Sequence, residues 1–182
     1  YMGKRFSEVI SAVELSLGRP LPPAFAADCQ ARTLGRLRQE LRLVDGVRSY
    51  LDAFAHIPRC IASSSSPDRL ALCLEVLGGL QSEFGSNVFS ASNVARGKPH
   101  PDIFLYAAQQ MGIPASRSIV LEDSASGVAA AIAAGMTVIG ILAASHIQRD
   151  QRARLCAAGA QHVAQSFAEA EAITRRLVAA MP

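Results

Sequence analysis

Short apolar runs alternate with helix-like segments along the chain after Pro58. The runs are rich in β-branched residues, and each is followed by polar residues and then by a segment with the apolar periodicity of a helix. Such alternation is typical of parallel strands, because a parallel connection needs a crossover that is usually a helix. The sequence therefore predicts an α/β fold, a doubly wound parallel sheet with strands at residues 60–62, 87–90, 118–121, 137–142 and 162–163.

The first part of the chain contains no strand-like run. Apolar residues between Phe6 and Leu17 lie on one helical face, and Gly18 follows as a stop signal. A second helix is expected over residues 24–43, and a short third helix after Asp45. The sequence thus predicts a helical unit over residues 1–44 and an α/β unit over residues 45–182.

Two adjacent carboxylates, Glu122 and Asp123, follow the apolar run at 119–121. They are expected at the carboxyl end of a strand, which is the edge where open α/β sheets bind ligands. Two neighbouring acids at such an edge favour a hard cation such as Mg²⁺. The alternative is an acidic loop or a helix start at which Asp123 or Ser124 serves as the N-cap.

A lysine and a run of serines are the other candidates for chemistry. Lys98 lies between glycine and proline, so its ammonium is presented from a constrained backbone and can reach a phosphate as a compact charge. A lone lysine is more often a solvated surface residue. Ser63–Ser66 follow a predicted strand directly, where hydroxyl and N–H groups can bind a phosphoryl group. Ser66 precedes Pro67, so it is also well placed as a helix N-cap.

Together these stretches resemble the haloacid dehalogenase-like superfamily, in its branch of phosphatases and phosphoglucomutases. The most specific stretches are residues 97–101 (GKPHP) and 121–127 (LEDSASG), and residues 61–65 (IASSS) are a weaker match. The resemblance runs from about Asp45 to the C-terminus and more loosely before that. It implies a Rossmann-like core whose helical cap, here residues 1–44, is inserted after the first core strand.

The resemblance also implies residue roles. It indicates a Mg²⁺-dependent phosphatase that hydrolyses a small organic phosphate, expected to be a sugar phosphate, through an aspartyl-phosphate intermediate. Ser63 and the N–H group of Ser64 would bind the phosphoryl oxygens, and Lys98 would offset negative charge in the transition state. Asp123, and Glu122 directly or through water, would bind Mg²⁺. The haloacid dehalogenases proper use no metal and lack this acidic pair, which favours phosphoryl chemistry.

One element of the family pattern is missing. Members of this family carry an Asp-x-Asp at the end of the first strand, as nucleophile and general acid/base, and no Asp-x-Asp occurs in these 182 residues. The strand that bears it would lie between the strands at 60–62 and 118–121, and without it their backbone groups would stay unpaired. We therefore expect these residues to be the C-terminal part of a longer protein, and to be inactive alone.

Other functions remain open at the level of sequence. A phosphosugar mutase of the same family would need a cap arginine where Phe6 stands, with Lys4 and Arg5 displaced from that position. Phosphonatases use a cap lysine, for which Lys4 has the wrong spacing. The opening residues look closer to phosphatases of the 6-phosphogluconate type, with Lys4 and Arg5 as candidate cap residues for substrate. A non-catalytic binding module on the same fold is the alternative of another class.

Composition excludes several further classes. The formal net charge is only +3, and the arginines of residues 32–48 are interpreted as a solvated helix face, so no nucleic-acid partner is expected. The four cysteines are widely spaced, without a CxxC pair, and are expected to be buried thiols of a reducing compartment. No membrane-spanning run or leader is apparent, which favours a cytoplasmic protein with a small-molecule substrate and an undetermined oligomeric state.

Overall fold

A computed structural model describes residues 3–78, 80–144 and 147–181. Its strands form two parallel sheets. One sheet pairs β1 (Ile61–Ser63) with β2 (Val88–Ser90), and the other has the order β3 (Ile119–Glu122), β4 (Thr137–Ile141), β5 (His162–Ala164). The parallel α/β architecture predicted from the sequence is confirmed.

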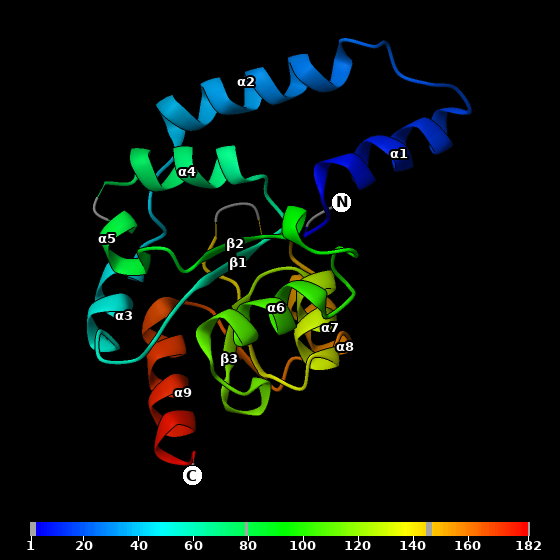
Figure 1. Cartoon of the computed structure of the whole chain (residues 1–182). Coiled ribbons are helices and arrows are strands. Elements are labelled where there is room, and N and C mark those ends of the chain that lie inside the picture. The colour runs from blue at the N-terminus through cyan, green and yellow to red at the C-terminus, as the bar shows by residue number, and fades with distance from the viewer. Residues whose placement is uncertain (1–2, 79, 145–146, 182) are drawn as a thin grey trace.

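Helices cover both faces of the strands, as Figure 1 shows. On one face lie α6 (Asp102–Met111), α7 (Ala125–Ala133) and α8 (Gln151–Ala157), and on the other lie α3 (Val47–Ala53) and α9 (Phe167–Ala179). Val138 belongs to the first apolar cluster and the next residue, Ile139, to the second. This alternation follows from the two-residue period of a strand that is buried on both sides.

The two sheets do not pair with each other. Within the described residues, β1 pairs with β2 alone and β3 pairs with β4 alone. The sequence predicts a missing strand between these two, and the open edges of β1 and β3 agree with that expectation. The link between the sheets is made by side chains and by α6, which contacts β1, β2 and α7.

The first two helices, α1 (Phe6–Leu17) and α2 (Phe25–Glu40), arch over the sheets in Figure 1. Helix α1 has the predicted bounds, and Gly18 ends it with a left-handed backbone (φ +64°). Helix α2 packs against α4 (Pro67–Val76), which joins the arch to the rest of the molecule. The division into a cap of residues 1–44 and a core stays a prediction.

Helix α2 ends at Glu40 rather than near residue 43. Leu41 adopts an extended backbone, and Leu43 packs with Leu51 and Leu74 in a third apolar cluster. Burial of Leu43 therefore outweighs its helix propensity. The same cluster holds Leu80 of α5 (Leu80–Phe84), a short helix that the sequence pattern did not predict.

The cysteines are less buried than expected. Cys29, Cys60 and Cys73 are half-buried, and Cys156 is exposed; all four are free thiols. Cys156 faces outward because its neighbour Leu155, about a quarter-turn away on α8, occupies the core with no exposed surface.

Among the described residues, no helix has both the length and the apolar character that a membrane crossing would require.

Candidate active site

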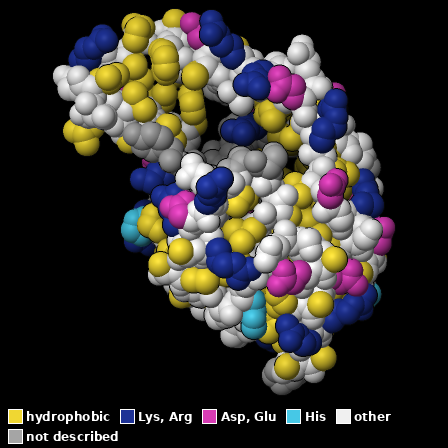
Figure 2. Space-filling model, turned by 180° about the vertical axis from the view of Figure 1, so that it is seen from behind, with side chains coloured by type: hydrophobic (Ala, Val, Ile, Leu, Met, Phe, Trp, Pro, Cys, Tyr) yellow, Lys and Arg dark blue, Asp and Glu magenta, His cyan; other side chains and the backbone are white. Residues whose placement is uncertain are grey.

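A cavity of about 610 Å³ lies between the arch of α1 and α2 and the carboxyl ends of β1 and β3. The space-filling view shows the molecule hollowed between these two parts, with basic side chains at the hollow (Figure 2). Its wall on the sheet side consists of residues 62–66, Lys98, Glu122 and Asp123, and its wall on the arch side includes residues from both helices. The three stretches singled out in the sequence thus meet at one cavity, as parallel strands ending at one edge require.

The serine run begins where β1 ends. Ser63 Oγ accepts a hydrogen bond from the N–H of Ser65 (3.1 Å), and Ser64 Oγ donates to the carbonyl of Gly3 (2.6 Å). Ser66 Oγ accepts from the N–H of Arg69 (3.4 Å) and is the N-cap of α4, as the alternative interpretation held. The loop is therefore tied down by its own hydroxyls, and it turns Ser63 and Ser64 to the cavity.

Lys98 is not a surface lysine. Only 5% of the residue is exposed, and its Nζ lies 2.6 Å from Glu122 Oε2 and 3.4 Å from the carbonyl oxygen of Ala62. The ammonium also lies 4.6 Å from the ring centre of Phe104, a favourable cation–π distance. Lys98 thus contacts β1 through Ala62 and β3 through Glu122. Its side chain bridges the two sheets at the wall of the cavity.

Glu122 is the last residue of β3 and is buried. Its Oε2 accepts from Lys98, while its Oε1 accepts from the N–H (3.1 Å) and the hydroxyl (2.6 Å) of Ser124. Burial by itself raises the pKa of this carboxyl, but attraction to the Lys98 ammonium and the hydrogen bonds from Lys98 and Ser124 outweigh burial. The pKa consequently lies below its ordinary value of 4.5.

This pKa shift predicts a pH dependence of stability. Because the pKa of Glu122 is lower in the folded than in the unfolded chain, its contribution to the free energy of unfolding is complete above pH 4.5 and is lost as the pH falls below that value. We expect the difference in stability between the wild type and Glu122→Gln to be large at neutral pH and to shrink on acidification. Urea unfolding in metal-free buffer over a pH series measures it.

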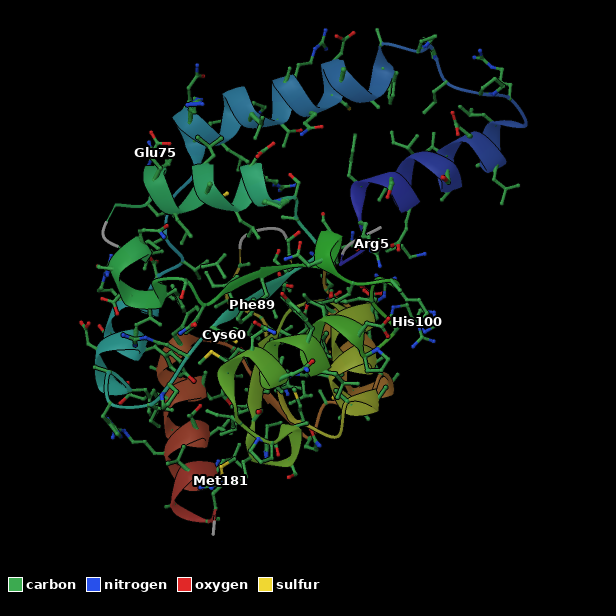
Figure 3. The ribbon with its side chains drawn as sticks, viewed as in Figure 1. Arg5, Cys60, Glu75, Phe89, His100 and Met181 are labelled. Atoms are coloured by element: carbon green, nitrogen blue, oxygen red, sulfur yellow. The ribbon has the colours of Figure 1, made fainter. Side chains whose placement is uncertain are left out.

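The matched control is Glu75→Gln, which removes an exposed carboxylate on the outer side of α4 (Figure 3). Its stability difference from the wild type should be small at every pH. If the free energies of unfolding of the wild type and of Glu122→Gln changed in parallel with pH, the buried ion pair would not stabilise the ionised carboxylate.

Asp123 also lines the cavity, and its carbonyl accepts a hydrogen bond from the amide of Gln151. Gln151 is 1% exposed and sits at the start of α8, so a buried side chain fixes the backbone beside the candidate metal ligand. The sequence pattern gave no signal for Gln151, because a glutamine early in a helix ordinarily faces solvent.

Two carboxylates on one cavity wall match the oxygen ligands that Mg²⁺ prefers. Both oxygens of Glu122 already accept hydrogen bonds, which favours an indirect role for Glu122. Within the described ranges, no group of three or more His, Cys, Asp or Glu side chains is arranged to hold a metal. The pair fits one side of a coordination shell, and the remaining oxygen ligands must come from water, substrate or other residues.

The two cap residues proposed from the sequence have different positions. Lys4 lines the cavity, whereas Arg5 does not. Arg5 Nε lies 3.5 Å from Glu8 Oε1, and both side chains press against Gly97, where an added Cβ would lie within 2.7 Å of them. Figure 3 shows Arg5 at the base of α1, on the same side as His100. Arg5 therefore belongs to the contact between the arch and the Lys98 loop.

Other lining residues were missed. Gln30, Thr33 and Leu34 of α2 and Arg69 of α4 face the cavity. Arg69 had a usable signal, because Ser66 as N-cap and Pro67 as first helical residue place it in the first turn of a helix beside the serine run. The α2 residues had none, since the packing of α2 on α4 is a tertiary contact.

Known proteins are similar to this chain in sequence. The sequence profile of the haloacid dehalogenase-like hydrolases matches residues 6–135. The chain is 28% identical over 147 residues to 6-phosphogluconate phosphatase of Escherichia coli, a match that covers 80% of this chain and 66% of that enzyme. It is 44% identical over 87 residues to a protein of Drosophila melanogaster described as a probable pseudouridine-5'-phosphatase, covering 46% of this chain and 38% of that protein. The chain thus spans less than two thirds of these relatives.

A solved structure is similar over a larger share of its length. The hydrolase of this type from Deinococcus radiodurans superposes with a TM-score of 0.75 and is 36% identical, covering 97% of this chain and 77% of that chain. That structure contains bound phosphate and sodium.

Proposed function

The chain belongs to the haloacid dehalogenase-like hydrolases, and we propose that it forms the phosphate-binding and metal-binding part of a Mg²⁺-dependent phosphatase acting on a small sugar phosphate. The observation that carries the proposal is the buried Lys98 ammonium, held by Glu122 at the same cavity as Ser63 and Asp123. Phosphate bound to the similar Deinococcus hydrolase, and the phosphatase names of the relatives, support the same reaction class.

In this proposal each residue acts on the phosphoryl group in a defined way. Ser63 Oγ and the N–H of Ser64 bind phosphoryl oxygens at the end of β1, and Lys98 offsets the charge that grows on them in the transition state. Asp123, with Glu122, would hold Mg²⁺, which when bound neutralises phosphoryl charge. The attacking carboxylate implied by the family resemblance is not among these 182 residues, since they contain no Asp-x-Asp.

The arch of α1 and α2 closes the other side of the cavity. Phe6 and Val9 of α1 and Leu34 of α2 give that side apolar surface, which excludes bulk water from the phosphoryl group. Phe6 stands where a mutase of this family would need an arginine, so hydrolysis is favoured over transfer to a second phosphate site.

Metal dependence tests the proposal. With protein expressed from its complete reading frame, we expect hydrolysis of p-nitrophenyl phosphate to require Mg²⁺ and to stop when the ion is chelated. Asp123→Asn should lower kcat/KM on the order of 100-fold, because one anionic ligand is lost while the side-chain shape is kept.

The control for this test is Asp150→Asn, which removes an exposed carboxylate beside α8 that does not line the cavity. Its kcat/KM should equal that of the wild type. Undiminished hydrolysis by Asp123→Asn, or in the presence of chelator, would remove the metal from the proposed mechanism.

A further inference from the structure

The hydroxyl of Ser90 is buried beside the serine run, outside the lining of the candidate active-site cavity. Ser90 is the last residue of β2, is 2% exposed, and lies in register with Ser63 at the end of β1. The two parallel strands therefore end at the same level, side by side (Figure 1). A buried hydroxyl needs hydrogen-bond partners, and those of Ser90 lie in the segments that follow the two strands.

Ser90 Oγ takes part in two hydrogen bonds. It accepts from the N–H of Ser92 (3.1 Å) and donates to the carbonyl of Ser65 (2.7 Å). Because an N–H group can only donate, the single proton of the Ser90 hydroxyl is left for Ser65. The first bond thus fixes the direction of the second, and Ser90 ties the serine run to the end of β2.

Ser65 is held at both of its backbone groups. Its carbonyl accepts from Ser90, and its N–H donates to Ser63 Oγ (3.1 Å). Since Ser63 Oγ accepts this bond, its own proton is available for an acceptor in the cavity that Ser63 lines. A phosphoryl oxygen is such an acceptor. Ser90 thus fixes Ser65, and Ser65 orients the Ser63 hydroxyl.

We propose that Ser90 is a positioning residue for phosphate binding, which holds Ser65 so that the Ser63 hydroxyl presents its proton to the phosphoryl group. This inference rests on the proposed phosphatase function. Without the Ser90 hydroxyl, the Ser65 carbonyl loses this hydrogen bond and its peptide group can rotate, so the N–H of Ser65 no longer fixes Ser63. The phosphoryl group then meets a hydroxyl that must be ordered at the moment of binding.

Inorganic phosphate, the product of the proposed reaction, is the probe for this effect. In protein from the complete reading frame, with p-nitrophenyl phosphate as substrate, we expect Ser90→Ala to raise the inhibition constant of phosphate about tenfold, the size of one hydrogen bond, and to lower kcat/KM to a similar extent. The Mg²⁺ concentration for half-maximal activity should stay at the wild-type value, because the hydrogen bonds of Ser90 lead to Ser65 and Ser92 rather than to the acidic pair.

Two variants distinguish this role from a folding defect. Ser90→Thr keeps the hydroxyl, and its added methyl group has room because Ser90 lines a second cavity, of about 180 Å³. It should restore most of the phosphate affinity that Ser90→Ala loses. Ser92→Ala is the matched control, since it removes an exposed hydroxyl two residues away and keeps the N–H that donates to Ser90. Its inhibition constant should equal that of the wild type.

A double-mutant cycle tests the route through Ser63. Ser63→Ala should lower kcat/KM by itself, and adding Ser90→Ala should lower it little further, because the hydroxyl that Ser90 positions is gone. An unchanged inhibition constant in Ser90→Ala, or effects of the two substitutions that multiply in full, would overturn the positioning role and leave the phosphatase proposal standing. A wild type that does not hydrolyse p-nitrophenyl phosphate would overturn both.

Discussion

Replacing Lys98 by methionine should abolish phosphatase activity and also destabilise the fold. Methionine keeps most of the length of the side chain but removes the charge, so the phosphoryl group loses its buried cation; we expect kcat to fall on the order of 1,000-fold. Glu122 would be left as a buried carboxylate without its counter-ion, which costs about 3–5 kcal/mol of stability. Kinetics on p-nitrophenyl phosphate and urea unfolding measure the two effects.

A second variant separates chemistry from folding. In Lys98→Met/Glu122→Gln both charges are gone, and the amide oxygen of the introduced glutamine can still accept from Ser124. Replacing a buried ion pair by neutral groups is often close to neutral for stability, so most of the lost free energy of unfolding should return. Activity should stay absent. Recovery of activity together with stability would mean that Lys98 has a structural role alone.

Replacing Gly127 by alanine should displace Glu122. Gly127 lies in the first turn of α7, and a Cβ there would lie 2.1 Å from Glu122 Cδ and 2.3 Å from Oε2. The carboxylate must move, because α7 and β3 fix both backbones, and its contacts with Lys98 and Ser124 are then lost. We expect a loss of about 3 kcal/mol in stability from overpacking and a large loss of activity.

Gly35→Ala is the control with the same chemical change. Gly35 lies inside α2, and nothing lies within 4 Å of a Cβ built on it. Alanine there should raise stability by about 0.5–1 kcal/mol through helix propensity, with unchanged activity. Circular dichroism of thermal unfolding and the phosphatase assay compare both variants. If Gly127→Ala behaved like Gly35→Ala, the close packing of α7 against Glu122 would be wrong.

The fold was predictable where local patterns decide it. The apolar period and Gly18 fixed α1 to the residue, and the β-branched runs located all the strands that the structure describes. Predictions failed where tertiary contacts decide. Leu43 lies outside α2 and packs in a buried cluster, a contact that no local pattern shows. The start of α7 is local by contrast: Ser124 is its N-cap, as the alternative interpretation of the sequence held, and its hydroxyl accepts from the N–H of Gly127 (3.0 Å).

In the candidate site, too, the residues marked by local patterns could be predicted and those placed by tertiary contacts could not. Ser63, Lys98 and Asp123 could be chosen from the sequence because strand ends and short motifs mark them, and the structure brings them to one cavity. The pairing of Lys98 with Glu122 joins a loop to the end of β3, 24 residues further along the chain, and no local pattern encodes it. The cavity-lining residues of α2 depend on how the arch packs on α4, so their place at the cavity was visible only in three dimensions, whereas Arg69 was within reach of the local cap signal at Ser66 and Pro67.

The separation of the core into two sheets affects how it unfolds. Strand β4 has hydrogen-bonded neighbours on both sides, whereas β1 and β3 each have one among the strands that the structure describes. Among the described residues, contact between the two sheets is made by α6 and by the Lys98 ammonium, which reaches Ala62 and Glu122 at once. The cation proposed to bind the phosphoryl group therefore also bridges β1 and β3, so a substitution that weakens its pairing with Glu122 should loosen the contact between the two sheets as well as lower the proposed activity.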